Sequence, residues 1–139
     1  MHSPILAPAV ALVAWSMVMW LWMYLTRIPA IQKMQMRLDP QAPRGEQMSQ
    51  LPASVRWKAD NYNHLMEQPT LFYAIALALA LMEQGAGINC TLAWAYVGLR
   101  VVHSVLQATW NKIEARFGLF FISSLVLLAL IFNDLCAAF

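Results

Sequence analysis

Arg100 and His103 stand three residues apart in an otherwise apolar stretch, and Gln107 follows one helical turn later. Residues at spacings of three and four share one face of an α-helix, so these side chains would form a polar stripe. The stretch, about 88–110, is long enough to cross a bilayer as a helix. An ionisable side chain at that depth is costly unless it meets a partner or a wet cavity. We therefore interpret the stripe as a candidate site that holds a polar ligand between helices.

A second polar group opens the preceding apolar run. Asn63 and Glu67 are four residues apart and share a helical face. Glu67 is an acid that could pair with Arg100 or His103, either to bind a ligand or only to hold helices together. Pro69 removes a backbone hydrogen bond and predicts a break or kink beside Glu67. A third interpretation also stays open, in which the helix starts near Pro69 and Glu67 lies at the level of the headgroups.

The elements that must position these residues are apolar runs of membrane-spanning length. The hydrophobic fraction is 60%, above the roughly 45–50% of soluble domains. Four runs reach the length of about 18–20 residues that a spanning helix needs: 5–26, about 63–82, 88–110 and 117–138. The runs are continuous rather than alternating and too few for a closed barrel. The sequence predicts one all-α domain over residues 1–139, a four-helix transmembrane bundle.

Basic residues fall on one side of this predicted bundle. Eight of the nine lie in the 27–58 loop and in the short connector before the last run: Arg27, Lys33, Arg37, Arg44, Arg56, Lys58, Lys112 and Arg116. The positive-inside rule makes that side cytoplasmic and both termini non-cytoplasmic. Topology and anionic headgroups account for this charge, so we expect lipid contact and no nucleic-acid partner.

The 27–58 loop has prolines and a glycine at its centre, which predicts an irregular connector. Ile31, Met34 and Leu38 are spaced for a short amphipathic continuation of the first helix. The loop is interpreted either as a solvated connector on the headgroups or as a lid over the polar site. Cys90 and Cys136 both fall near non-cytoplasmic helix ends. A disulfide is possible there, but two free thiols are favoured, and neither cysteine has metal-ligand spacing.

Over nearly its whole length the chain resembles the membrane-associated proteins in eicosanoid and glutathione metabolism (MAPEG). The resemblance rests on the polar-headed second run at 63–72 and on residues 100–104, which read Arg-Val-Val-His-Ser. Arg116 follows His103 by thirteen residues, the spacing of the arginine that activates the glutathione thiol in that family. The chain is similar to a divergent, bacterial-type member, which implies a multi-pass protein of the bacterial inner membrane.

The resemblance implies a homotrimer that binds glutathione between neighbouring subunits, towards the cytoplasmic side. It implies that Arg100 and His103 line the glutathione site and that Arg116 is catalytic. An arginine beside a thiol lowers the pKa of the thiol, and the thiolate is the nucleophile. Asn63, Glu67 and Gln107 join the set of residues expected to hold the polar ligand; no metal site is expected.

Two functional hypotheses follow. The first is a glutathione- or other thiol-dependent membrane transferase or peroxidase that acts on a hydrophobic electrophile drawn from the bilayer. The second is a non-catalytic trimeric membrane scaffold or accessory protein that has lost the thiol site. Departures from the family pattern motivate the second hypothesis. Glu67 and Pro69 are two residues apart rather than four, and Gln107 stands where the family commonly has a tyrosine.

Overall fold

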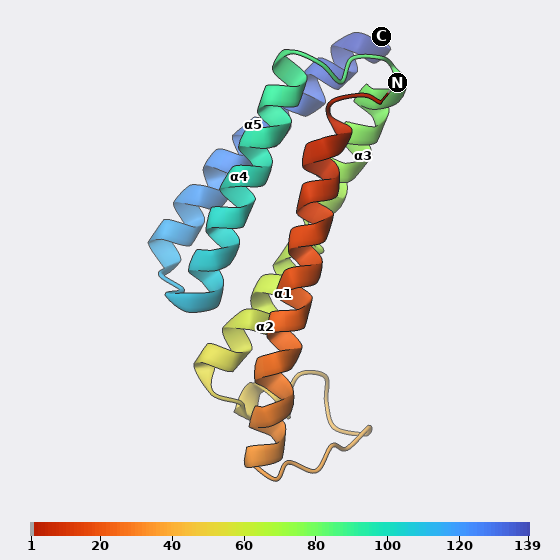
Figure 1. Ribbon diagram of the computed structural model, residues 1–139. Coiled ribbons are helices and arrows are strands. Elements are labelled where there is room, and N and C mark those ends of the chain that lie inside the picture. The colour runs from red at the N-terminus through yellow and green to blue at the C-terminus, as the bar shows by residue number, and fades with distance from the viewer. Residues whose placement is uncertain (1) are drawn as a thin grey trace.

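The computed structural model describes residues 2–139, and within them all regular structure is helical. The helices are α1 (Leu6–Lys33), a 3-10 turn η1 (Met48–Gln50), α2 (Ala53–Leu65), α3 (Pro69–Leu81), α4 (Ile88–Thr109) and α5 (Ile113–Ala138). Figure 1 shows α2 and α3 as the two halves of one bent rod beside α1, with α4 and α5 as a packed hairpin. Counting the bent rod once, the fold is the predicted all-α four-helix bundle.

The bent rod breaks where the sequence predicts it. Residues 66–68 form a turn, and Pro69 is the first residue of α3. Proline has no backbone N–H and its ring collides with the preceding turn of a helix, so a continuous helix cannot pass this point without distortion. At the first position of a helix the missing N–H has no intrahelical partner to lose. The break therefore lies beside Glu67, in the middle of the span.

Several predicted boundaries are wrong. Helix α1 continues past Pro29 to Lys33, because a proline near the end of a helix removes only one of its bonds. The helix stops at Met34, and Gln35 has a left-handed φ of 49°, so the expected amphipathic continuation does not reach Leu38. Helix α2 starts directly after Pro52, well before the predicted residue 63. Helix α5 starts at Ile113 rather than at 117. The irregular loop is therefore 34–52 rather than 27–58.

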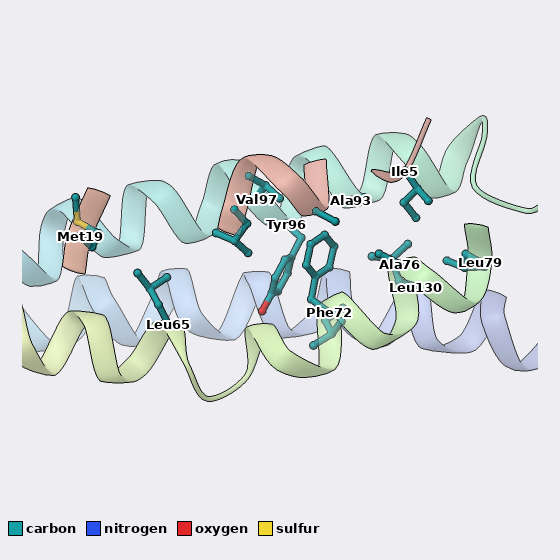
Figure 2. Packing of buried hydrophobic residues seen from close by; sticks show 13 residues of the cluster. Ile5, Met19, Leu65, Phe72, Ala76, Leu79, Ala93, Tyr96, Val97 and Leu130 are labelled. Carbon is teal, nitrogen blue, oxygen red and sulfur yellow. The ribbon is translucent and has the colours of Figure 1, made fainter. Parts of the chain in front are cut away.

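The apolar core follows the helical spacing of each segment. Figure 2 shows the ring of Phe72 from α3 beside that of Tyr96 from α4; the rings are stacked, with centroids 4.6 Å apart. Further buried apolar side chains from all the long helices belong to the same core cluster, among them Ile5, Leu12, Met19, Leu65, Ala76, Leu79, Val97 and Leu130. The opposite faces of α1 and α5 leave many large apolar side chains exposed, as Val13, Leu25, Leu128 and Phe132 illustrate. Such outer surfaces suit contact with lipid.

Three segments of the described chain are long and apolar enough to cross a membrane: α1, the α2–α3 rod and α5. Helix α4 has the 22 residues that a span needs but is less apolar than these three segments. The reason is its polar stripe. Asn89, Arg100, His103 and Gln107 are all buried inside the bundle, where neighbouring helices rather than lipid surround them. The chain is an integral membrane protein.

The two chain termini and the two basic connectors lie towards opposite ends of the bundle. In Figure 1 both termini lie at one end, and the 34–52 loop and the α4–α5 turn lie towards the other. The two basic connectors therefore share one side, as their charge predicts; the assignment of that side to the cytoplasm stays a prediction. Cys90 is half-buried and Cys136 exposed, and both are free thiols.

Candidate functional site

The polar stripe of α4 faces α2 inside the bundle. The Arg100 side chain is fully buried, with 0% exposure. Its Nη2 lies 2.6 Å from Nδ1 of His64, which joins α4 to α2. His64 was not among the predicted ligand residues. The signal that could have found it is its position three residues after Asn61, with which it shares a helical face, and Asn61 is buried.

Aromatic rings close this site on the side of α5. The rings of His64 and His103 are stacked with centroids 4.9 Å apart. The ring of Phe120 packs edge-on against His64 at 5.3 Å, and the Arg100 guanidinium lies 5.8 Å from the centre of the same ring. A cation over an aromatic face is attracted by the ring quadrupole. Three spans, α2, α4 and α5, thus enclose one cationic centre around Arg100. We call this centre, together with the polar side chains that continue it along α4 (His103, Ser104 and Gln107), the polar column.

One turn further from the basic end, three side chains bridge the break between α2 and α3. The Tyr96 hydroxyl donates to Oε1 of Gln68 at 3.1 Å, and Nε2 of Gln68 donates to the hydroxyl of Ser124 at 2.9 Å. Ser124 donates in turn to the carbonyl of Phe120. The interruption at Pro69 therefore lets Gln68 connect α4 to α5, and these bonds fix the bend from which Glu67 projects.

Towards the basic end, the polar column contains buried atoms that have no hydrogen-bond partner in the described part of the chain. They are Nε and Nη1 of Arg100, the Ser104 hydroxyl, Oε1 of Gln107, and both amide atoms of Asn61. Lys58 Nζ lies 3.4 Å from the carbonyl of Ala108; this contact and the His64–Arg100 contact set the register of α2 against α4. That register puts Asn61 level with Ser104. Buried polar groups are rarely left unpaired in proteins, so these atoms suit water or a polar ligand.

Asn63 and Glu67 lie on a different face of the rod from this column. Both side chains are exposed, whereas Asn61 and Leu65 point into the bundle. Within residues 2–139 we find no hydrogen bond from the Glu67 side chain to Arg100, whose Nη2 is taken by His64. Glu67 lies in the turn at residues 66–68, beyond the last residue of α2, and its side chain is exposed, so the expected direct pairing with Arg100 is not formed within a single chain. Pairing across a subunit boundary stays a prediction.

Arg116 lies at the basic end of the same column. It is half-buried, and its Nη1 donates to the side chain of Asn111. Asn111 follows the end of α4 with a φ of 54°, a left-handed conformation that asparagine adopts more readily than most residues. Arg116, Phe120 and Ser124 are spaced by four and share one face of α5. The column thus runs from Ser124 at the break to Arg116 near the basic connectors.

The fold and this column define an all-helical integral membrane protein with a cationic, partly unsatisfied polar centre enclosed by three of its spans. The chain belongs to the MAPEG family, whose model matches residues 5–135. No curated protein and no solved structure matches the chain.

Proposed function

We propose that the protein is a glutathione- or other thiol-dependent membrane transferase or peroxidase that acts on a hydrophobic electrophile. The family includes glutathione transferases and peroxidases. The observation that carries the proposal is the half-buried Arg116, which the Asn111 side chain holds at the basic end of the polar column. An orientated guanidinium at such a position would stabilise a thiolate, which is the nucleophile in these reactions.

The residues present suit a tripeptide thiol. Glutathione carries carboxylates, an ammonium group and amides, and bound glutathione would supply the thiol. Arg116 would face the thiolate, and the exposed Glu67 and Asn63 would receive the ammonium and amide groups. The unpaired nitrogens of Arg100, with His103 and Gln107, would form the inner polar wall of the site. The exposed apolar surfaces of α1 and α5 support delivery of the second substrate from the bilayer.

The proposal includes a homotrimer. In one chain, the Glu67 and Asn63 side chains are exposed, so they are available to a ligand that lies between neighbouring subunits. We therefore propose that Glu67 of one subunit and the basic end of the column of the next line the same site. Native mass spectrometry in nanodiscs should give a trimer, and a monomer would contradict this part of the proposal.

A non-catalytic scaffold is the second candidate, and one observation favours it. The most strongly polar residue of α4, Arg100, is fully buried and bonded to His64, an arrangement that can hold spans together without any ligand. The two candidates differ in what the purified protein does with a thiol.

The test uses detergent-solubilised full-length protein. Glutathione binding is measured by calorimetry, and turnover is measured with glutathione and a chromogenic aryl halide. Binding with turnover that depends on Arg116 supports the transferase. No detectable glutathione binding by protein that is folded and oligomeric supports the scaffold. The control variant is Lys112→Ala, which removes an exposed cation from the same connector.

A further inference from the structure

A cavity of about 390 Å³ lies at the basic end of the molecule, and three arginines line it. Arg27 comes from the end of α1, Arg44 from the 34–52 loop and Arg56 from the start of α2. Ser49 and Asp60 also line this cavity, which we call the arginine pocket. Its volume falls within the range of about 300–1,000 Å³ that is common for small-molecule sites.

The arginine pocket and the polar column use different faces of α2. Arg56, Asp60 and Asn63 follow one another at spacings of four and three and line the pocket. Asn61 and His64 lie on the face that packs against α4. None of the three pocket arginines has a role in the proposed thiol chemistry, so the pocket needs a separate explanation.

The charge of the arginine pocket is unbalanced. Three guanidinium groups face a cavity whose lining contains one carboxylate, that of Asp60. Arg56 uses its Nε to donate to the carbonyl of Leu51 at 3.0 Å, which leaves its two terminal nitrogens for other partners. Among residues 2–139, Nε of Arg27 is buried and has no hydrogen-bond partner. A buried donor without an acceptor costs free energy, and an anion in the cavity would provide that acceptor.

We propose that the arginine pocket binds a phosphate group. Guanidinium groups present paired N–H donors that match two phosphate oxygens, so several arginines around one cavity favour phosphate over a single carboxylate. The pocket lies on the basic side of the spans, where phosphate headgroups gather around a membrane protein. A lipid headgroup and a soluble phosphate monoester present the same chemistry to it. The three arginines that carry this proposal have no part in the proposed thiol reaction, and Asn63 is the residue that lines this pocket and is also assigned to the thiol site.

The experiment is calorimetric titration of delipidated full-length protein in a non-ionic detergent. The probes are glycerol phosphate, short-chain phosphatidic acid and short-chain phosphatidylcholine. Saturable binding of phosphatidic acid alone identifies a lipid headgroup as the source, whereas equal binding of glycerol phosphate identifies a soluble compound. Either result supports the site. Absence of binding by both phosphate monoesters, or binding of phosphatidylcholine as strong as that of phosphatidic acid, would overturn it.

Matched variants locate the binding. Arg27→Gln and Arg44→Gln should each weaken binding about tenfold or more, the effect of losing one charge-assisted contact. The Arg44 side chain is exposed, so its replacement should leave the bundle folded. Arg37→Gln removes the same charge from an exposed loop position outside the pocket and should change binding by no more than about twofold. Equal losses in Arg37→Gln and Arg44→Gln would show general attraction by the basic loop and would refute the site.

Discussion

His64 and Arg100 join two spans through a contact of 2.6 Å between Nδ1 and Nη2. The contact is partly buried, and the His103 and Phe120 rings pack around His64. It ties α2, just before the break at Pro69, to the middle of α4. The position of the bend and the position of the cationic centre are therefore linked through one pair of side chains.

Removing His64 should destabilise the bundle. His64→Ala leaves the buried Arg100 with one acceptor fewer, and a stranded donor of a charged group costs about 1–3 kcal/mol. Thermal unfolding in detergent, followed by tryptophan fluorescence, should show a lower midpoint. Asn63→Ala, an exposed change one residue away, should shift stability by less than about 0.5 kcal/mol.

A double-mutant cycle would separate this contact from simple loss of packing. The coupling between His64→Ala and Arg100→Met should be about 1 kcal/mol or more, because residues in direct contact are not additive. Additive effects of the two changes would mean that the hydrogen bond contributes nothing to stability.

Arg116→Ala should lower kcat by about 10²-fold or more while the protein stays folded and oligomeric. The expected loss is that of one group that stabilises developing negative charge. Steady-state kinetics with glutathione and the aryl halide measures it, and Lys112→Ala is the control for charge at the same connector. Turnover at the wild-type level in Arg116→Ala would make Arg116 only an anchor to the headgroups.

Gly85→Ala should destabilise the end of the bundle that holds the termini. A Cβ at residue 85 would lie 2.0 Å from Oγ of Ser3 and 2.7 Å from Cγ2 of Ile5. Ile5 is fully buried, so the strain should cost about 1–3 kcal/mol. The matched change Gly118→Ala meets no atom within 4 Å and lies in a helix; it should be neutral or stabilising by up to about 1 kcal/mol. Equal unfolding midpoints for the two variants would contradict the close packing of Gly85.

Cys136 offers a test of orientation. It is exposed near the C-terminus, whereas Cys90 is half-buried. If both termini are non-cytoplasmic, a membrane-impermeant maleimide should label Cys136 in intact spheroplasts and should not label it in sealed inverted vesicles. Cys136→Ser should abolish the rapid labelling, and Cys90→Ser should leave it unchanged. Rapid labelling of Cys136 only in inverted vesicles would reverse the topology inferred from the basic connectors.

The sequence by itself determined the all-helical bundle, because long apolar runs leave few alternatives in a bilayer where every backbone group needs an internal partner. It also determined the break at Pro69, which follows from the chemistry of one residue, and the buried polar stripe of α4, whose spacing puts Arg100 and His103 on one face.

Only the tertiary structure decided which side chains meet that stripe. His64, near the end of α2, contacts Arg100, whereas Glu67 lies in the turn before Pro69 and is exposed. Sequence spacing cannot tell which face of the span packs on α4. The start of α2 was missed for a related reason: residues 53–62 are too polar to be read as part of a span, yet Ala59 and Asn61 are buried. The arginine pocket likewise joins Arg27, Arg44 and Arg56, which are distant in sequence, because the loop folds back between two helix ends.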